Sequence, residues 1–167
     1  IAPLLGPLPG EKILDACAAP GGKSTHIAEL MNNEGKIWSV DRSSRRSKKI
    51  LANSERLGIN CLQLLVTDSN QLLAKHPEWK SFFDRILIDA PCSGLGTLSR
   101  HPDARWRMNK DNIQQLVLLQ SQLLHSLTPL LKNGGKLVYS TCTIHPEENF
   151  KQIKKFLQFK SQFSLEY

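Results

Sequence analysis

The sequence predicts an α/β protein built on one doubly wound, mostly parallel sheet. Three observations predict this fold class. Short apolar segments typical of strands alternate along the chain with amphipathic segments typical of helices. Glycine or asparagine follows the helical segments. The segment "FDRILIDA" (residues 83–90) is apolar at successive positions, as expected of a strand that is buried on both faces. Strands that alternate with helices form a parallel sheet covered by helices.

In the first half of the chain we expect strands over residues 12–17, 36–41 and 61–66, and helices over residues 24–31 and from Ser43 to Gly58. Ser43 is a candidate N-cap because its hydroxyl can accept from the first free N–H groups of a helix. Gly58 is suited to the turn that ends that helix, which carries Arg and Lys on its outer face.

In the second half, "FDRILIDA" is strand four. Asp111 and Gln114 resemble a capping box, which predicts a long helix that reaches Leu131 and stops at Gly134 and Gly135. "KLVYST" (residues 136–141) is strand five. "HPEENFKQIKKFLQF" (residues 145–159) is a last helix, because proline suits the first turn and Glu147 and Glu148 are favoured there by the helix dipole.

Length and composition are those of one soluble domain. The chain has 167 residues, 40% hydrophobic and 22% charged, enough to bury about two-thirds of its unfolded surface. No apolar run approaches the roughly 20 residues that span a bilayer. The formal net charge of +7 is typical of proteins that bind nucleic acid. The charge alone is explained equally well by a basic surface that only keeps the protein soluble.

The four cysteines are Cys17, Cys61, Cys92 and Cys142. They lie far apart without a CxxC pair, so the spacing indicates neither a zinc site nor a dense disulfide framework. We therefore expect no metal and a reducing, cytoplasmic location.

Polar residues follow each expected strand. In open α/β sheets, ligands bind outside the carboxyl ends of the strands. The residues at these ends are Ala18 to Lys23, Asp41, Asp68, Asp89 to Gly94, and Thr141 with Cys142. A single aspartate in this position is more often a helix cap. Three aspartates at corresponding strand ends, together with two cysteines, favour a binding site.

The stretch "ILDACAAPGGKST" ends like a phosphate-binding P-loop, G-x-x-x-x-G-K-[ST]. The first glycine of that motif would fall at position 17, which is Cys17. Asp41 closes strand two 19 residues after Gly22, where nucleotide-binding folds place the acid that binds ribose hydroxyls. That acid would repel a triphosphate, whereas Gly21 and Gly22 allow close approach of the backbone to a ligand. Asp15 could pair with a cationic group or order the loop. An adenosine ligand without phosphates fits best, and S-adenosylmethionine is the common one.

Three segments carry a family resemblance: "DACAAPGGKST", "DAPCSGLGTLSRHPDARWR" and "YSTCTIHPEEN". In this order they resemble the RsmB/NOP family of RNA 5-methylcytosine methyltransferases, most closely its bacterial Sun/Fmu ribosomal RNA enzymes. The resemblance covers about Leu5 to Asn149 and implies a Rossmann-like class I S-adenosylmethionine-dependent methyltransferase fold. It also leads us to expect a single catalytic domain over residues 1–167, without the N-terminal RNA-binding domain and C-terminal end of the bacterial members.

The chemistry of this family explains why two cysteines are needed. Carbon 5 of cytosine is a weak nucleophile, but a thiolate that adds to carbon 6 converts the ring into a reactive enamine. Release of the thiol afterwards requires an acid–base group. The resemblance implies that Cys142 of "TCT" attacks and that Cys92 of "PCSG" assists release. Chemistry alone permits the reverse, because DNA 5-methylcytosine enzymes attack with a Pro-Cys thiol. Cys17 and Cys61 are interpreted as small buried hydrophobes.

The remaining roles follow from charge and from the resemblance. Asp89 would hydrogen-bond the cytosine at nitrogen 3 or the amine, and Lys23 would stabilise that carboxylate or contact the cofactor. The resemblance assigns Asp41 to the ribose and Asp68 to the adenine. The expected cofactor site comprises Cys17, Ala18, Ala19, Pro20, Gly21, Gly22, Lys23, Asp41, Asp68 and Asp89.

A mixture of cations and an aromatic side chain lies between the "PCSG" and "TCT" segments. These residues, Arg100, His101, Arg105, Trp106 and Arg107, could grip an extruded nucleotide. A solvated loop with Trp106 packed inward is the alternative for each residue taken singly.

Together these features predict an RNA (cytosine-C5) methyltransferase that acts on 16S ribosomal RNA, with transfer RNA as the second candidate. A P-loop nucleotide hydrolase and a non-catalytic RNA-binding scaffold are the alternatives from other classes. The expected partner is RNA, with no DNA and no membrane, and the expected state is a monomer.

Overall fold

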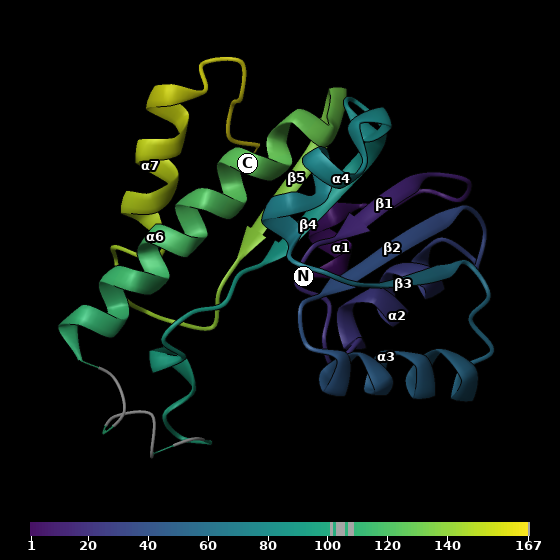
Figure 1. Ribbon diagram of the computed structural model, residues 1–167, viewed down its shortest axis with the longest axis horizontal. Coiled ribbons are helices and arrows are strands. Elements are labelled where there is room, and N and C mark those ends of the chain that lie inside the picture. Colours follow the sequence, from purple (N-terminus) through teal and green to yellow (C-terminus); the bar gives the residue numbers. More distant parts are fainter. Residues whose placement is uncertain (101, 103–105, 107–108, 167) are drawn as a thin grey trace. The chain divides into compact units, whose positions relative to one another are not determined.

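The computed structural model describes residues 1–100, 102, 106 and 109–166. Its sheet has five parallel strands in the order β3-β2-β1-β4-β5 (Figure 1). The strands are β1 (Lys12–Asp15), β2 (Lys36–Asp41), β3 (Leu62–Val66), β4 (Phe83–Asp89) and β5 (Leu131–Ser140). The predicted doubly wound parallel sheet is therefore confirmed, and all five expected strands are present.

The α-helices whose bounds lie in the described ranges are α1 (Ala2–Leu5), α2 (Gly22–Leu30), α3 (Ser44–Arg56), α4 (Leu72–Lys75), α6 (Lys110–Leu127) and α7 (Phe150–Phe159). Within the described residues, short 3₁₀ turns cover Ser69–Gln71, Pro77–Trp79, Leu95–Thr97 and Thr128–Leu130. The predicted N-cap of α3 is confirmed, since the Ser43 hydroxyl accepts from the Arg46 N–H at 3.3 Å.

Two predicted helices have wrong boundaries. The long helix ends at Leu127, because Pro129 lies in a 3₁₀ turn and the strand begins already at Leu131. The same helix begins before Asp111, and Asn109 rather than Asp111 accepts from the backbone at its start. The last helix begins at Phe150 instead of 145, so Glu148 lies in a turn before α7.

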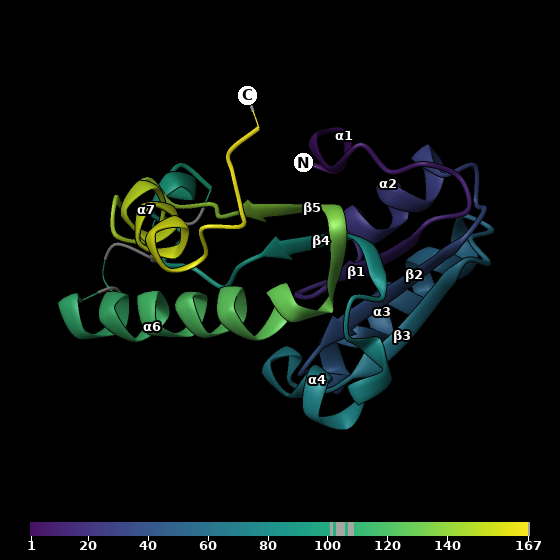
Figure 2. The same cartoon turned by 90° about the horizontal axis from the view of Figure 1, so that it is seen from above.

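Parallel strands require crossover connections, which are right-handed. The chain moves from β1 to β3 in one direction along the sheet and then returns to β4 and β5. Connections of opposite direction cover opposite faces, and Figure 2 shows α2 and α4 on the two sides of the sheet. The core between α1, α2 and the sheet contains fully buried Leu5, Ile13, Ile27, Ile37 and Leu87.

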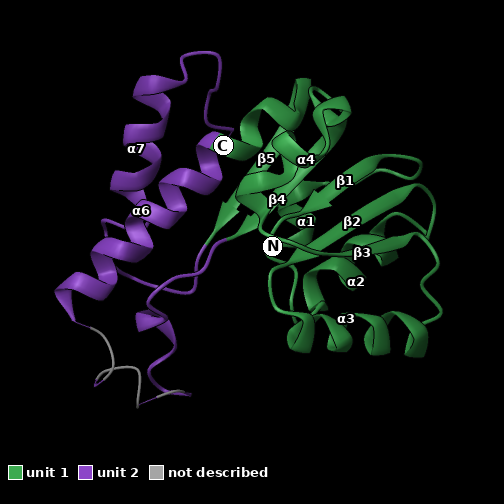
Figure 3. Ribbon diagram, viewed as in Figure 1, with its two compact units in different colours: residues 1–89, 126–140 green, residues 90–125, 141–167 purple. Residues whose placement is uncertain are grey.

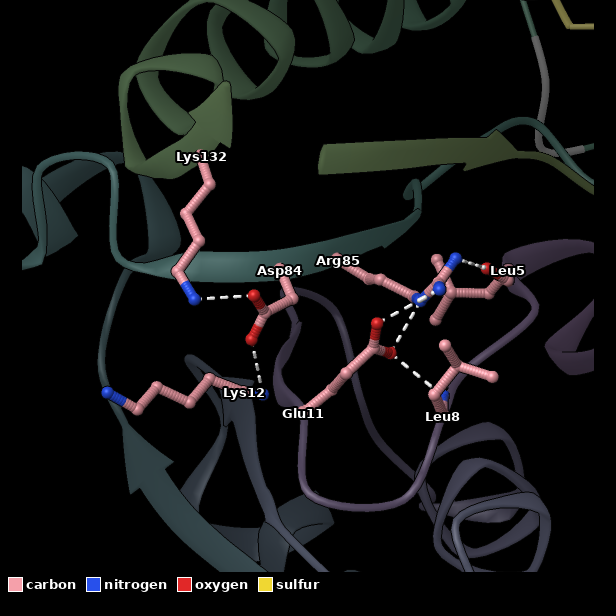
Figure 4. Close-up of polar contacts among 7 residues, drawn as sticks. All are labelled: Leu5, Leu8, Glu11, Lys12, Asp84, Arg85 and Lys132. Atoms are coloured by element: carbon pink, nitrogen blue, oxygen red, sulfur yellow. Dashed lines mark hydrogen bonds and ion pairs between the residues drawn. The ribbon is translucent and has the colours of Figure 1, made fainter. Parts of the chain in front are cut away.

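The amino ends of the strands are held by ion pairs (Figure 4). Arg85 on β4 donates from Nε and Nη2 to the Glu11 carboxylate at 2.6 and 2.9 Å, and from Nη1 to the Leu5 carbonyl at 2.8 Å. Asp84 accepts from the Lys12 N–H at 2.8 Å. These contacts fix the segment before β1 to β4, and they leave the carboxyl ends of the strands to carry the candidate site.

The chain divides into two compact units (Figure 3). Unit 1 comprises residues 1–89 and 126–140 and contains the sheet. Unit 2 comprises residues 90–125 and 141–167. In the part of the chain that the structure describes, no helix has the length and apolar character needed to cross a bilayer.

Candidate functional site

In unit 1, the loop after β1 approaches α3 closely. Gly21 has a φ of +107°, a conformation that side chains rarely permit. A Cβ atom at this position would also lie 3.0 Å from Ile50 Cα. At Gly22, which is exposed, an added Cβ would meet no atom within 4 Å. The glycine pair therefore packs the loop against α3 on one side and leaves its other side open to a ligand.

Asp15, the last residue of β1, is fully buried beneath this loop. Ser24 Oγ donates to its Oδ2 at 2.6 Å, and Ser39 Oγ donates to Ser24 Oγ at 2.9 Å. Its Oδ1 has no hydrogen-bond partner among the described residues. Burial raises the pKa of Asp15 from 3.8 to about 6. The bond with Ser24 supports the expected role in ordering the loop, whereas pairing of the orphaned Oδ1 with a cationic group stays a prediction.

Lys23 and Asp89 come from different elements and meet at the carboxyl edge of the sheet. Lys23 Nζ lies 2.5 Å from Asp89 Oδ2, and Ser140 Oγ donates to Asp89 Oδ1 at 2.7 Å. Both side chains are about one-third exposed. The ion pair is the contact expected of a lysine that stabilises this carboxylate, and each carboxylate oxygen keeps a lone pair for a further donor.

Asp41 and Asp68 have structural partners. The Asp41 carboxylate is almost fully buried, and both of its oxygens accept from Arg46 Nη2, at 3.0 and 2.8 Å. Asp68 Oδ1 accepts from the Asn70 N–H at 2.9 Å, so the capping role considered for these aspartates holds for Asp68. Their proposed contacts with the ribose and the adenine stay predictions.

Burial raises the pKa of both cysteines of unit 1. Burial, followed by the Asp15 carboxylate, raises the pKa of Cys17 to about 12. Cys61 is buried in the core, and this burial raises its pKa. The interpretation of Cys61 as a small buried hydrophobe is confirmed, whereas Cys17 is half-buried in the loop.

In unit 2, the structure brings Cys92 and Cys142 together. Their Sγ atoms lie 3.2 Å apart, and the Cys142 N–H donates to Cys92 Sγ at 3.3 Å. Cys142 is exposed and Cys92 is half-buried. Burial, followed by the Cys142 side chain, raises the pKa of Cys92 to about 12. Cys92 is therefore a protonated thiol at neutral pH that can donate to the sulfur of Cys142.

The "PCSGLG" loop also holds the backbone of Cys142. The Gly96 N–H donates to the Cys142 carbonyl at 3.0 Å. A Cβ atom at Gly96 would lie 2.8 Å from that carbonyl oxygen, so this approach requires glycine. Both polar backbone groups of Cys142 thus bind the loop that carries Cys92.

Sequence reasoning missed several polar residues around the thiols. They are Ser93, Gln120, Thr143, Glu148 and Asn149. The expectation that Glu148 lies in the first turn of the last helix is wrong, because α7 begins at Phe150 and the Glu148 side chain is fully buried before it. No sequence signal separated the two acids that follow Pro146, because only the fold shows that Glu147 pairs with Lys151 whereas Glu148 is buried.

The basic segment lies partly within the described residues. Trp106 is 87% exposed, so the alternative that it packs inward is wrong. Arg100 is exposed as well. His101, Arg105 and Arg107 lie outside the described residues. No group of three or more possible metal ligands occurs among the described residues.

Comparison with known proteins gave a family and curated relatives. Residues 2–167 match the family described as 16S rRNA methyltransferase RsmB/F. The chain is 49% identical over 158 residues to the probable ribosomal RNA small subunit methyltransferase B of Synechocystis sp., covering 95% of the chain and 35% of the relative. It is 47% identical over 165 residues to ribosomal RNA small subunit methyltransferase B of Photorhabdus laumondii, covering 97% and 37%. The chain thus spans about a third of the length of these relatives.

Solved structures share the fold. The structure of NSun6 from Pyrococcus horikoshii with SFG has a TM-score of 0.84 and 36% identity, covering 95% of this chain and 39% of that one. A methyltransferase homolog protein from the same organism has a TM-score of 0.80 and 39% identity, covering 94% and 48%. These similarities confirm the expected Rossmann-like methyltransferase fold.

Proposed function

The chain belongs to the 16S rRNA methyltransferase RsmB/F family, and we propose that it is the catalytic domain of an S-adenosylmethionine-dependent RNA (cytosine-C5) methyltransferase. The substrate that we propose is 16S ribosomal RNA, because the curated relatives carry the name of ribosomal RNA small subunit methyltransferase B. The net charge of +7 supports a polyanionic substrate.

The observation that carries the proposal is the pair of unlike thiols. An exposed cysteine beside a half-buried, protonated cysteine supplies the two functions that cytosine C5 methylation needs. Cys142 is accessible for attack, and Cys92 holds a proton within 3.2 Å of the attacking sulfur. This geometry supports Cys142 as the nucleophile, as the family resemblance implied.

In the first step, the Cys142 thiolate forms a bond between Sγ and C6 of the cytosine. The electron pair of the C5–C6 double bond forms a C4–C5 double bond, and the pair of the C4–N3 double bond moves to nitrogen 3, which takes up a proton, so that C5 becomes the nucleophilic carbon of an enamine. Asp89, held by Lys23 and Ser140, would accept a hydrogen bond from the protonated nitrogen 3 or the exocyclic amine. When bound, S-adenosylmethionine supplies the electrophilic methyl group for C5.

In the second step, a base removes the proton from C5. The electron pair of that C–H bond restores the C5–C6 double bond, and the bond between C6 and Cys142 Sγ breaks with its electron pair leaving on the sulfur. Cys92 would serve this release, because its thiol can donate a proton toward the departing sulfur.

The residues of unit 1 fit the cofactor. The loop Cys17–Lys23 has its open side at Gly22, and the buried Asp15 Oδ1 lacks a partner among the described residues. Asp41 would hold the ribose hydroxyls, Asp68 would lie beside the adenine, and Lys23 and Asp89 would border the methyl donor. The NSun6 structure with SFG, an S-adenosylmethionine analogue, supports the assignment to this cofactor.

The test is removal of each thiol. Cys142→Ala should abolish methylation of 16S RNA and give no covalent protein–RNA adduct. Cys92→Ala should lose turnover but trap RNA in an adduct that survives denaturing electrophoresis and requires S-adenosylmethionine. Cys61→Ala, which removes a thiol from the core, is the matched control and should methylate normally.

A trapped adduct with Cys142→Ala and none with Cys92→Ala would reverse the roles of the two cysteines. Activity of both variants without any adduct would refute the two-cysteine mechanism. If bisulfite mapping showed methylation of another RNA and none of 16S RNA, the proposed substrate would be wrong, but the proposed cytosine-C5 chemistry would stand.

A further inference from the structure

The two thiols lie on segments without regular secondary structure. Pro91 to Gly94 and Thr141 to His145 belong to no helix or strand. Irregular segments lack the backbone ladder that fixes a strand, so other groups must keep two sulfur atoms 3.2 Å apart. In unit 2, the backbone bonds of Cys142 are supplemented by the side chains of two consecutive residues, Glu148 and Asn149.

Glu148 holds the segment of Cys92. Its carboxylate accepts from the Ser93 N–H at 2.9 Å and from Ser93 Oγ at 2.5 Å. It also accepts at 3.0 Å from Gln120 Nε2, which in turn donates to the Pro91 carbonyl at 2.9 Å. Both neighbours of Cys92 in the chain are therefore bound, directly or through Gln120, to one buried carboxylate.

Asn149 holds the segment of Cys142 in the same way. Its Oδ1 accepts from Thr141 Oγ1 at 2.5 Å, and its Nδ2 donates to the Thr143 carbonyl at 2.8 Å. Both neighbours of Cys142 are thus bound to one amide. The hydroxyls of Ser93 and Thr143, 2.8 Å apart, join the two segments.

We propose that Glu148 and Asn149 are positioning residues that set the distance and alignment of the Cys92 and Cys142 thiols. Both side chains act through the neighbours of the cysteines, Ser93, Thr141 and Thr143. A buried carboxylate is a costly way to fill a core, and apolar residues of similar volume often stabilise a protein more. What the carboxylate supplies here is several directed acceptors, which fix a geometry. The inference rests on the proposed function for its catalytic meaning, but its geometric part can be tested without RNA.

The first experiment oxidises the thiol pair with diamide. Two S–H bonds are lost and one S–S bond forms, while the diamide takes up the two hydrogens and becomes a hydrazine. The yield of the Cys92–Cys142 disulfide is followed by mass spectrometry of peptides. Glu148→Gln and Asn149→Ala should slow this reaction at least tenfold. Glu147→Gln, one residue away and on the surface, should react within twofold of the wild-type rate.

Asn149→Asp gives a finer readout. A carboxylate can still accept from Thr141 but cannot donate to the Thr143 carbonyl, whereas its protonated form can. The oxidation rate of this variant, relative to wild type at the same pH, should therefore rise as the pH falls from 6 to 4, the range in which an ordinary aspartate, with a pKa of about 3.9, begins to bind its proton. A residue with only a general role in stability would not give this pH profile.

The second experiment measures methyl transfer in single turnovers. The rate should fall at least tenfold in Glu148→Gln and Asn149→Ala, while the dissociation constant of S-adenosylmethionine stays within twofold. Should Glu148→Gln fail to fold, Ser93→Ala removes a hydrogen bond to Glu148 and the link to Thr143, and it serves the same test.

Wild-type oxidation rates in folded Glu148→Gln and Asn149→Ala would overturn the inference, as would a flat pH profile for Asn149→Asp. If the variants oxidise slowly as expected but the wild-type protein methylates no RNA, the positioning inference holds and the proposed function fails. The two failures are therefore distinguishable.

Discussion

The carboxyl edge of the sheet in unit 1 and the thiol segments of unit 2 are held by different means. In unit 1, parallel strands end at the same edge, and the side chains that follow them, Lys23 with Asp89 and Arg46 with Asp41, form ion pairs in which at least one partner is exposed to solvent. In unit 2, irregular segments are fixed by hydrogen bonds to Glu148 and Asn149. The sheet thus positions residues through backbone register, whereas the thiols depend on a few individual side chains.

The thiols of Cys17 in unit 1 and Cys92 in unit 2 also differ in their surroundings. Cys17 and Cys92 both have a pKa of about 12, and burial is the main cause for both. The second cause differs: it is the Asp15 carboxylate for Cys17 and the Cys142 thiol for Cys92. A high pKa therefore marks Cys17 as inert, but marks Cys92 as a proton donor beside a second sulfur.

The largest expected effect is a loss of stability in the sheet that leaves the oxidation rate of the thiol pair unchanged. Leu87→Ala removes a fully buried side chain from β4 and should lower the free energy of unfolding by about 2–5 kcal/mol. Leu118→Ala, at an exposed position of α6, should change it by no more than about 0.5 kcal/mol. Urea unfolding gives both values. Under conditions where Leu87→Ala is folded, diamide should oxidise the thiol pair at the wild-type rate, and a slower reaction would show that the regions are not independent.

Asp15 gives the next effect, and it depends on pH. Its pKa is about 6 in the folded protein against the ordinary value of 3.8 expected in the unfolded chain, so between these values the folded protein binds a proton that the unfolded chain does not. Stability should therefore fall, by about 1–3 kcal/mol, as the pH rises from 4 to 7. Asp15→Asn cannot titrate and should lack this contribution. Urea midpoints of the two proteins across this range check it, and parallel curves would contradict the burial argument.

Gly21 tests the loop of the cofactor site. Gly21→Ala places a Cβ 3.0 Å from Ile50 Cα at a φ of +107° and should cost about 1–3 kcal/mol. Gly58→Ala is the control, because its φ is also positive but nothing lies within 4 Å, and it should cost about 1 kcal/mol. Thermal unfolding ranks the two. In calorimetry, only Gly21→Ala should also weaken S-adenosylmethionine binding, and equal effects would remove the loop from the cofactor site.

The smallest stability effect is expected at Lys23. The pair with Asp89 is about one-third exposed, so Lys23→Gln should change stability by less than about 1 kcal/mol. Methyl transfer should nevertheless fall at least tenfold, because Asp89 loses the partner that holds it. Lys151→Gln, which breaks a surface pair in unit 2, should leave both stability and activity within error. Normal activity of Lys23→Gln would make its ion pair purely structural.

The sequence alone determined the parallel sheet and which residues lie at the carboxyl ends of its strands. Apolar segments that alternate with amphipathic ones predicted five parallel strands, and strand ends predicted that Lys23 and Asp89 share an edge. These predictions succeed because they depend on local periodicity and on strand direction. They failed at Leu131, where a helix was expected to continue, because the strand pairing with β4 decides that boundary and is not a local property.

Only the tertiary structure decided how the thiols are arranged. Cys92 and Cys142 are 50 residues apart, and their 3.2 Å separation depends on contacts across that distance. Glu148 showed this most clearly: two residues after Pro146 its carboxylate was expected to suit a helix start, yet it lies buried against Ser93. Sequence periodicity carries information about neighbours along the chain. The partner of a single side chain in an irregular segment is fixed by the folded backbone, and no pattern in the sequence encodes it.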